Sequence, residues 1–196
     1  MNSQPKQAQR HELRKQILAR REALSVQDRQ QKSAQIIKAL VEHNSFRQAK
    51  TIFTYINFRS EVITETLKEA CFVLNKRICV PLTVKKDSRL VPYELTKSSQ
   101  LHLGYCGIPE PDPKTFSQIA PHEIDLTILP GSVFDGQGGR LGYGGGFYDR
   151  FVQNDAPNSI RIGLAFDLQL VEDLPLLPHD QKLHHLITET HIFNFT

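Results

Sequence analysis

The chain has 196 residues, of which 39% are hydrophobic and 23% are charged, as is ordinary for a folded domain. No apolar run approaches the roughly 18 residues that a membrane-spanning helix needs, and the first sixteen residues (MNSQPKQAQRHELRKQ) lack the apolar stretch of a secretory signal. The three cysteines have no CxxC spacing, which argues against a disulfide framework or a zinc site. We therefore expect a single cytoplasmic domain over residues 1–196, with reduced thiols and no membrane partner.

The net charge of +3 is concentrated near the start of the chain. Residues 1–50 carry eleven lysines and arginines against four acidic residues, whereas the remainder is net acidic. A basic segment of this kind suits an anionic partner such as a nucleic acid, a membrane surface or a phosphorylated small molecule, and it is also typical of a solvated helix face. Charge alone does not choose among these alternatives.

The first half of the chain is predicted to alternate helices and strands. Leucines and isoleucines at helical spacing predict a helix over residues 7–23, and Ser25 is a typical N-cap for a second helix that continues to about residue 43. Segments rich in β-branched and aromatic residues predict strands on either side of a further helix. These elements are expected at 50–58 (strand), 63–76 (helix), 77–84 (strand) and 89–95 (strand).

The second half is predicted to add four strands around a loop-rich stretch. Four prolines make residues 107–122 a loop-rich connection, and a second proline-bounded loop is expected at 174–182. Strands are expected at 124–130, 159–166, 185–190 and 191–195. Because strands alternate with helices, the pattern predicts a three-layer α/β domain with a largely parallel sheet.

The most unusual feature of the sequence is the glycine segment, residues 131–146, which holds eight of the eleven glycines. It follows a predicted strand and precedes a short helix expected from about 145 to 153. In an open α/β sheet this is the carboxyl end of a strand, where ligands bind, and glycine amides beside a helix N-terminus can hold phosphate. The segment matches neither a dinucleotide fingerprint nor a Walker A loop. A tight turn that needs positive φ is the alternative explanation.

Side chains beside the glycines strengthen the phosphate hypothesis. Arg140 offers a planar guanidinium for phosphate or carboxylate, and Asp149 is a candidate Mg²⁺ ligand. Tyr148 could stack on a ring or donate from its hydroxyl. Each has a simpler explanation, since Arg140 and Asp149 could form a surface ion pair and Tyr148 could belong to the core.

Four aromatic residues and the three cysteines have no motif that assigns them a function. Aromatic side chains that could wall a ring-binding pocket are more often part of the core when they lie in strands; they are Phe53, Tyr55, Phe58 and Tyr105. Cys71 and Cys79 lie in apolar surroundings and are expected in the core, whereas Cys106 has no predicted role.

The segment LPGSVFDGQGGRLGYGGGFYDRF, residues 129–151, closely resembles the glycine-rich motif of the 5-formyltetrahydrofolate cyclo-ligase family, also called methenyltetrahydrofolate synthetases. Other segments agree with the family in order and spacing, so the resemblance covers roughly residues 10–190. They are RHELR (10–14), RSEVIT (59–64), GIPEP (107–111) and PLLPHDQKLHHLITET (175–190).

The resemblance implies a three-layer α/β/α sandwich with a mixed sheet. It also implies an enzyme that uses ATP and Mg²⁺ to convert 5-formyltetrahydrofolate into 5,10-methenyltetrahydrofolate, with release of ADP and phosphate. The substrate is a small molecule whose polyglutamate tail is anionic, which would give the basic N-terminal third a second use. A nucleic-acid partner is not implied, and we expect a monomer.

The resemblance further implies roles for individual residues. Arg140 and Tyr148 would be catalytic, and Asp149 and Asp180 would bind the metal. The residues expected to bind ATP are Arg10, Arg14, Arg140, Leu141, Gly142, Tyr143, Gly144, Gly145, Gly146, Phe147 and Tyr148. The residues expected to bind folate are Ile56, Glu61, Tyr143, Gly144, Gly145, Gly146 and Phe147.

Two positions depart from the family pattern. Arg10 stands where the family usually has lysine, and arginine is bulkier and forked, which bears on ATP affinity. His184 stands where a further aspartate is frequent, which would make the metal site sensitive to pH if that aspartate shapes it.

Three other functions stay open at this point. One is a folate-binding module that has lost turnover, for which the two departures are the support. Another is a nucleic-acid-binding protein that uses the basic first helix, although the sequence lacks the interleaved aromatic and basic residues of common RNA modules. The third is a different phosphate-binding α/β enzyme, such as a sugar-phosphate isomerase.

Overall fold

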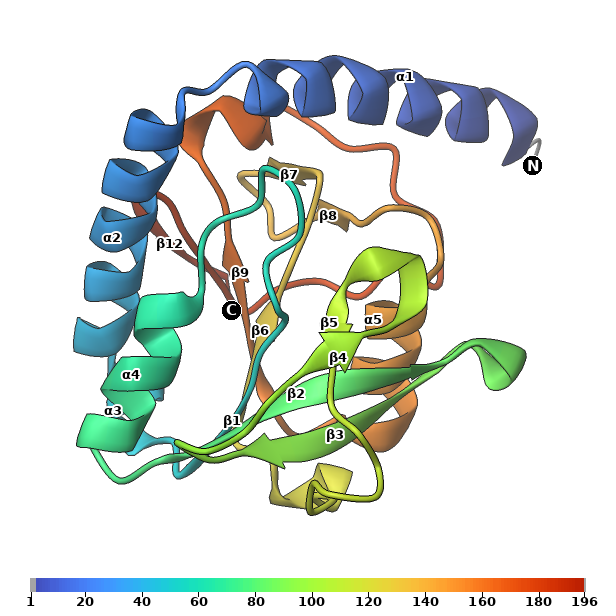
Figure 1. Cartoon of the computed structure of the whole chain (residues 1–196). Coiled ribbons are helices and arrows are strands. Elements are labelled where there is room, and N and C mark those ends of the chain that lie inside the picture. The colour runs from blue at the N-terminus through green and yellow to red at the C-terminus, as the bar shows by residue number, and fades with distance from the viewer. Residues whose placement is uncertain (1–2, 196) are drawn as a thin grey trace.

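A seven-stranded sheet forms the centre of the computed structural model, which describes residues 3–195 (Figure 1). The strand order is β12-β11-β9-β6-β1-β2-β3. The inner strands are parallel to one another, while β3 and β12 pair antiparallel at the two edges. The strands are β1 (Thr51–Phe53), β2 (Arg77–Val84), β3 (Arg89–Leu95), β6 (Leu126–Leu129), β9 (Ile160–Leu164), β11 (His185–Ile187) and β12 (Ile192–Asn194). The prediction of a largely parallel mixed sheet is confirmed.

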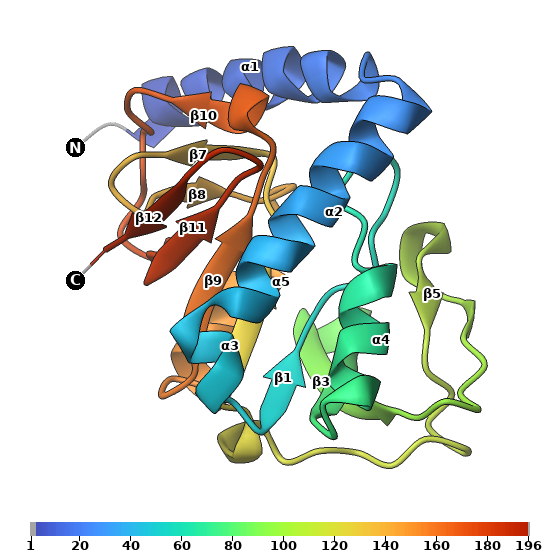
Figure 2. The ribbon, with the colours of Figure 1, turned by 90° about the vertical axis from the view of Figure 1, so that its left-hand side faces the viewer.

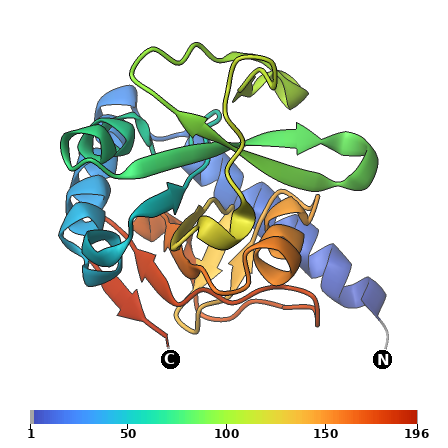
Figure 3. The same ribbon diagram turned by 90° about the horizontal axis from the view of Figure 1, so that it is seen from below.

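Helices cover both faces of this sheet, which confirms the three-layer α/β/α architecture. Figures 2 and 3 show α2, α3 and α4 on one face and α5 on the opposite face. The helices are α2 (Val26–Glu42), α3 (Asn44–Gln48), α4 (Glu65–Val73) and α5 (Phe147–Arg150), which continues into a π-helical turn (Phe151–Asp155). Short 3₁₀ turns lie at Lys85–Asp87, Tyr105–Gly107, Pro121–Glu123 and Asp167–Gln169.

Each face of the sheet has its own apolar core. Ile52 and Ile78 pack in the core beneath α2–α4, whereas the next residues along the same strands, Phe53 and Cys79, pack in the core beneath α5. This division follows from the strand geometry, because successive side chains point to opposite faces. Both cysteines expected in the core, Cys71 and Cys79, are fully buried.

The first helix, α1 (Ser3–Glu22), crosses over one end of the sheet rather than packing on a face (Figure 1). Its buried Ile17 belongs to a small third core with Val133, Leu141 and Leu174. A short turn then leads to α2, where the Ser25 hydroxyl accepts a hydrogen bond from the Asp28 amide at 3.0 Å, as the N-cap prediction requires.

The glycine segment folds into a second, three-stranded sheet that the sequence pattern did not indicate. The order is β10-β7-β8, with strands β7 (Val133–Asp135), β8 (Arg140–Leu141) and β10 (Leu170–Val171). Gly138 has φ +83° in the turn between β7 and β8, and Gly144 and Gly146 have φ +105° and +66° before α5. Positive φ at these glycines confirms that the segment makes tight turns.

Two further elements differ from the predicted ones. The strand expected over 50–58 ends at Phe53, and residues 54–64 form a loop in which Arg59 has φ +52°. The stretch predicted as a loop over 107–122 contains β5 (Pro109–Glu110), which pairs with β4 (His102–Leu103) in a two-stranded sheet. Both elements wall the cavity described below. Among residues 3–195 we find no helix with the length and hydropathy that crossing a bilayer requires.

Candidate active site

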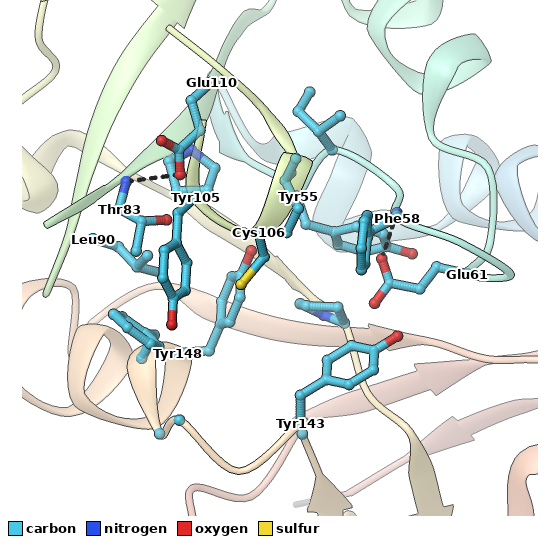
Figure 4. Close-up of a pocket in the computed structure, with 18 of the residues that line it drawn as sticks. Tyr55, Phe58, Glu61, Thr83, Leu90, Tyr105, Cys106, Glu110, Tyr143 and Tyr148 are labelled. Carbon is cyan, nitrogen blue, oxygen red and sulfur yellow. Dashed lines mark hydrogen bonds between the residues drawn. The ribbon is translucent and has the colours of Figure 1, made fainter. Parts of the chain in front are cut away.

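A cavity of about 440 Å³ opens beside the loops that follow β1 and β6 (Figure 4). These loops leave the carboxyl ends of adjacent parallel strands, where ligands of open α/β sheets bind. Aromatic and apolar side chains make up most of its walls, including Tyr55, Ile56, Phe58, Leu90, Tyr105, Phe147 and Tyr148. The cavity therefore suits a flat, largely apolar ring system.

Three of the four aromatic residues with an open assignment line this cavity. Tyr55, Phe58 and Tyr105 are on its wall. Phe53 instead stacks on Phe151 in the core, with 4.5 Å between ring centroids.

Two buried carboxylates, those of Glu61 and Glu110, line this cavity. Glu61 is 5% exposed, and its Oε2 accepts a hydrogen bond from the Phe58 amide at 2.8 Å. Burial raises the pKa of Glu61, although the Phe58 amide and the positive charge of Arg21 act in the opposite direction. Glu110 is 8% exposed, and its Oε1 accepts a hydrogen bond from the Thr83 amide at 3.2 Å.

The Glu110 carboxylate occupies space that only a glycine neighbour leaves open. A Cβ at Gly104 would lie 2.2 Å from Glu110 Oε2, a distance at which the carboxylate would have to move. Glu110 is not among the residues that the sequence predicts for the site, although it lies in the GIPEP segment (107–111).

The tyrosines around Glu61 keep their protons at neutral pH. Burial raises the pKa of Tyr143 to about 12, and burial together with the Glu61 charge raises the pKa of Tyr55 and Tyr148 well above the ordinary value. The Tyr55 hydroxyl donates to the Val62 carbonyl at 3.2 Å, so the hydroxyls of Tyr143 and Tyr148 are the donors for a ligand or for Glu61.

A second, smaller cavity of about 100 Å³ adjoins the first and is polar. Its lining residues include Gln7, Arg10, Arg14, Gly142, Gly144, Gly146, Asp149, Leu177, His179 and Asp180. Three residues, Gly142, Gly146 and Asp149, line both cavities. The end of the glycine segment and the start of α5 therefore form a shared wall.

Two arginines of α1, Arg10 and Arg14, line this smaller cavity. Arg10 forms a bidentate ion pair with Asp180, in which Nη2 lies 2.9 Å from Oδ1 and Nη1 donates to Oδ2. Arg10 also donates to the Pro175 carbonyl at 3.1 Å. Arg14 donates from Nε to the Gly142 carbonyl at 2.7 Å. The basic face of the first helix is thus engaged at this cavity and is not merely solvated.

The buried Arg140 guanidinium holds Asp149, one residue of the shared wall, in place. The side chain is 2% exposed, and it donates to the Pro130 carbonyl at 2.9 Å and to Asp149 Oδ1 at 2.8 Å. The Gln181 amide donates to the same Asp149 oxygen at 3.1 Å. Arg140 and Asp149 do form an ion pair, but it is largely buried and not on the surface.

The residues present fit a polyphosphate. Within residues 3–195, the backbone amides of Tyr143 to Gly146 have no hydrogen-bond acceptor, and a Cβ at Gly144 would meet open space. Free backbone amides and arginine side chains both donate hydrogen bonds to phosphate oxygens.

The residues present also fit Mg²⁺ held jointly with phosphate. No group of three histidine, cysteine or acidic side chains that could hold a metal lies within the described chain. Asp149 and Asp180 would therefore supply at most part of a coordination shell. Mg²⁺ commonly binds in this way, through one or two carboxylates together with phosphate oxygens and water.

Most residues predicted for the site are brought together at the two cavities. Ile56, Glu61 and Arg140 line the larger cavity, and Arg10, Arg14, Asp149 and Asp180 line the smaller one. Within the segment from Gly142 to Tyr148, Gly144 lines only the smaller cavity, and its neighbours line the larger one.

Leu141 and His184 are placed differently from what the sequence suggested. The Leu141 side chain is fully buried in the third core, so it has a packing role and lines neither cavity. His184 Nδ1 accepts a hydrogen bond from the Arg161 amide at 2.9 Å, and its ring also lies outside both cavities. The geometry therefore does not support a pH-sensitive metal site through His184.

The fold and the paired cavities define an α/β protein with a small polar cavity, lined by arginines and glycines, beside an aromatic-walled pocket. A model of the 5-formyltetrahydrofolate cyclo-ligase family matches residues 6–189, and the chain belongs to this family. It is accordingly an enzyme of the cyclo-ligase type.

Named relatives and solved structures agree with this assignment. The 5-formyltetrahydrofolate cyclo-ligase of Haemophilus influenzae is 35% identical over 95% of this chain and 99% of its own. The Escherichia coli K12 enzyme of the same name is 30% identical over 91% of this chain and 100% of its own. The solved structure of 5,10-methenyltetrahydrofolate synthetase from Aquifex aeolicus superposes with a TM-score of 0.83 at 28% identity, and covers 94% of this chain and 92% of its own.

Proposed function

We propose that the chain catalyses the ATP- and Mg²⁺-dependent cyclisation of 5-formyltetrahydrofolate to 5,10-methenyltetrahydrofolate, with ADP and phosphate as the other products. The observation that carries the proposal is the shared wall of Gly142, Gly146 and Asp149 between two cavities of different chemistry. The larger cavity suits a pterin ring, and the smaller one suits a polyphosphate. A group that passes from one ligand to the other would cross only this wall.

The reaction needs activation of an unreactive carbonyl. An N-formyl group is a poor electrophile, and its oxygen is a poor leaving group. ATP supplies a phosphoryl group that turns this oxygen into a leaving group, after which N10 of the folate attacks the formyl carbon and phosphate departs. Phosphoryl transfer of this kind depends mainly on positioning and on neutralising charge.

The residues of the smaller cavity supply that positioning. Arg14 and the amides of residues 143–146 would bind the phosphates, and Asp149, whose Oδ1 is held by Arg140 and the Gln181 amide, would offer its other oxygen to Mg²⁺. Asp180 would be the second carboxylate for the metal, and the charge of Arg10, which pairs with Asp180, would help to neutralise the phosphates.

The residues of the larger cavity would bind and orient folate. Ile56 and Phe147 pack against the ring system, and Glu61 accepts hydrogen bonds from ring N–H groups. Tyr148 retains its proton and lines the larger cavity, so its hydroxyl would donate to the reacting carbonyl. The proposal includes a monomeric, cytoplasmic enzyme that also accepts polyglutamated substrate.

An absorbance assay tests the proposed function. Purified protein is mixed with 5-formyltetrahydrofolate, Mg²⁺ and ATP, and the near-ultraviolet band of the methenyl product is followed. Parallel reactions omit ATP or replace it with an analogue that cannot transfer its γ-phosphoryl group. Growth of the band only with ATP supports the proposal. Folate binding without the band would instead support the second candidate, a folate-binding module without turnover.

A further inference from the structure

Arg21 is a buried cation at the end of α1, away from the arginines of the smaller cavity. The residue is 1% exposed, and its three donor positions are each used. Nε donates to Ser60 Oγ at 3.0 Å, Nη1 to the Gly131 carbonyl at 3.2 Å and Nη2 to the Tyr143 hydroxyl at 2.6 Å. All three partners are neutral, so among the described residues the charge is buried without a direct ion pair.

A buried charge without a direct counter-ion is costly, and a neutral side chain could fill the same space. The Arg21 charge affects Glu61, which lines the larger cavity. Ser60 precedes Glu61 in the chain, and the Arg21 charge is one of the influences that lower the pKa of Glu61 against the effect of burial. Arg21 thus acts on the larger cavity without lining it.

Tyr143 connects Arg21 to Glu61. Its hydroxyl accepts from Arg21 and points toward the Glu61 carboxylate (Figure 4), and Tyr143 is one of the groups that lower the pKa of Glu61 against the effect of burial. Tyr143 has a glycine on each side in the sequence, and 47% of the residue is exposed. Little packing therefore holds its ring in place. The Arg21 guanidinium lies 5.9 Å from its ring centroid and supplies a second contact. A donor to the hydroxyl oxygen also polarises the O–H bond, so the hydroxyl becomes a better donor to Glu61 or to a ligand in the larger cavity.

We propose that Arg21 is a positioning residue for folate binding, which holds the Tyr143 hydroxyl and the turn that carries Glu61 in the orientation that binds the pterin ring. The inference rests on the proposed function, because it takes folate as the ligand of the larger cavity. It adds a residue to the folate site and separates α1 into two parts: Arg10 and Arg14 serve the smaller cavity, and Arg21 serves the larger one.

Direct binding measurements separate this role from general stability. The dissociation constant of 5-formyltetrahydrofolate is measured by calorimetry without ATP for wild type, R21M and Y143F, and thermal unfolding is followed in parallel. We expect R21M to weaken folate binding about tenfold and Y143F about fivefold, with the KM for ATP changed less than about twofold. R20M, which removes the exposed neighbouring charge on the same helix, is the matched control and should bind folate normally.

The double variant tests the route through Tyr143. If Arg21 acts through the hydroxyl, Y143F in the R21M background adds little, because the contact is already lost. Full additivity, or equal loss of folate and ATP affinity, would overturn the inference. If R21M does not fold, unchanged folate affinity in Y143F overturns it.

A pH profile supplies a readout that packing alone would not move. The groups that face Glu61 are Arg21, Tyr55, Tyr143 and Tyr148, and the tyrosines are neutral. Folate affinity should fall as pH decreases through the Glu61 pKa, and in R21M that decrease should occur at higher pH. R21K keeps the charge and should restore the midpoint.

The same experiment separates the two proposals. A wild-type protein that binds folate but forms no methenyl band contradicts the proposed function, while the affinities of the variants still decide the role of Arg21. A wild-type protein that binds no folate overturns both.

Discussion

Arg10 and Asp180 lie 170 residues apart in the chain and form a buried bidentate ion pair in the smaller cavity. The planar guanidinium matches both carboxylate oxygens, which a lysine ammonium at the same position could not do. The departure from the usual lysine of the family therefore has a structural consequence, because α1 is tied to the loop before β11 through this pair.

Breaking this pair should destabilise the protein. Arg10→Ala leaves the Asp180 charge without its partner, and we expect a loss of roughly 2–3 kcal/mol in the free energy of unfolding, because the adjoining cavity lets some water reach the carboxylate. The double variant with Asp180→Ala should recover part of this loss. Chemical denaturation of the four proteins measures the coupling, and full additivity would contradict it.

The stabilisation by Asp180 should also depend on pH in a defined direction. Burial alone would raise the pKa of Asp180, but hydrogen bonds from Arg10 and the Leu177 amide lower it below the ordinary value. The contribution of the ion pair is thus present above an unfolded-state pKa of about 3.9 and is lost as pH falls through the lower folded-state pKa. The stability gap between wild type and Arg10→Ala should therefore close below about pH 4.

Asp149 should be needed for turnover and not for folding. Asp149→Asn keeps an oxygen that accepts from Arg140, so we expect a folded protein with no methenyl product even at saturating Mg²⁺. Asp149→Ala should instead also lose roughly 2–3 kcal/mol of stability, because it leaves the buried Arg140 charge without its carboxylate partner. The exposed Asp173→Asn is the control. Normal turnover by Asp149→Asn would remove this carboxylate from the proposed metal site.

Glu110 should contribute to folate affinity through one oxygen. Glu110→Gln retains Oε1, which accepts from the Thr83 amide, and replaces the other carboxylate oxygen with an amide that cannot accept. We expect folate binding to weaken about tenfold with little change in the KM for ATP. Calorimetry with Glu172→Gln, an exposed control, checks the result. Unchanged affinity would show that Glu110 does not contact the ligand.

Cys106 should be the one cysteine that reacts rapidly with a thiol reagent. It is exposed and lines the larger cavity, whereas Cys71 and Cys79 are fully buried, and burial raises the pKa of Cys71 to about 12. N-ethylmaleimide should add once and block folate binding, and bound folate should slow the addition. Mass spectrometry of wild type and Cys106→Ser measures this. Modification without loss of binding would place Cys106 away from the ligand.

The main sheet was predictable from sequence because its strands are short runs of apolar, β-branched residues. Most residues that line the two cavities were predictable because they lie in the long glycine-rich motif or in the shorter segments that resemble the family. Arg21 was not predictable in this way, since beside Arg20 it has the pattern of a solvated basic face. The available signal was its position on one face of α1 with Arg10, Arg14 and Ile17, at helical spacing. Arg140 likewise had the sequence context of a phosphate-binding residue, and only the structure shows that it donates to the Pro130 carbonyl and to Asp149.

The glycine segment illustrates a second limit. Its composition indicated both a turn and a ligand site, and the structure uses different glycines for different purposes. Gly138 makes a turn in the β7–β8 hairpin, whereas Gly131 leaves room for the Phe134 ring, which a Cβ would approach to 2.4 Å. Such close approaches depend on residues distant in space, so the small sheet of β7, β8 and β10 could not be inferred from the glycine count.

The shared wall has a consequence for inhibition. Since Gly142 and Gly146 carry no side chains and border both cavities, a single compound with a pterin-like head and a phosphate-bearing tail could bridge them over bare backbone. Once one end is bound, the other binds at the high effective concentration that a short linker imposes. Such a bisubstrate ligand would discriminate against proteins that recognise only folate or only nucleotides, because neither kind offers both halves of the site at this spacing.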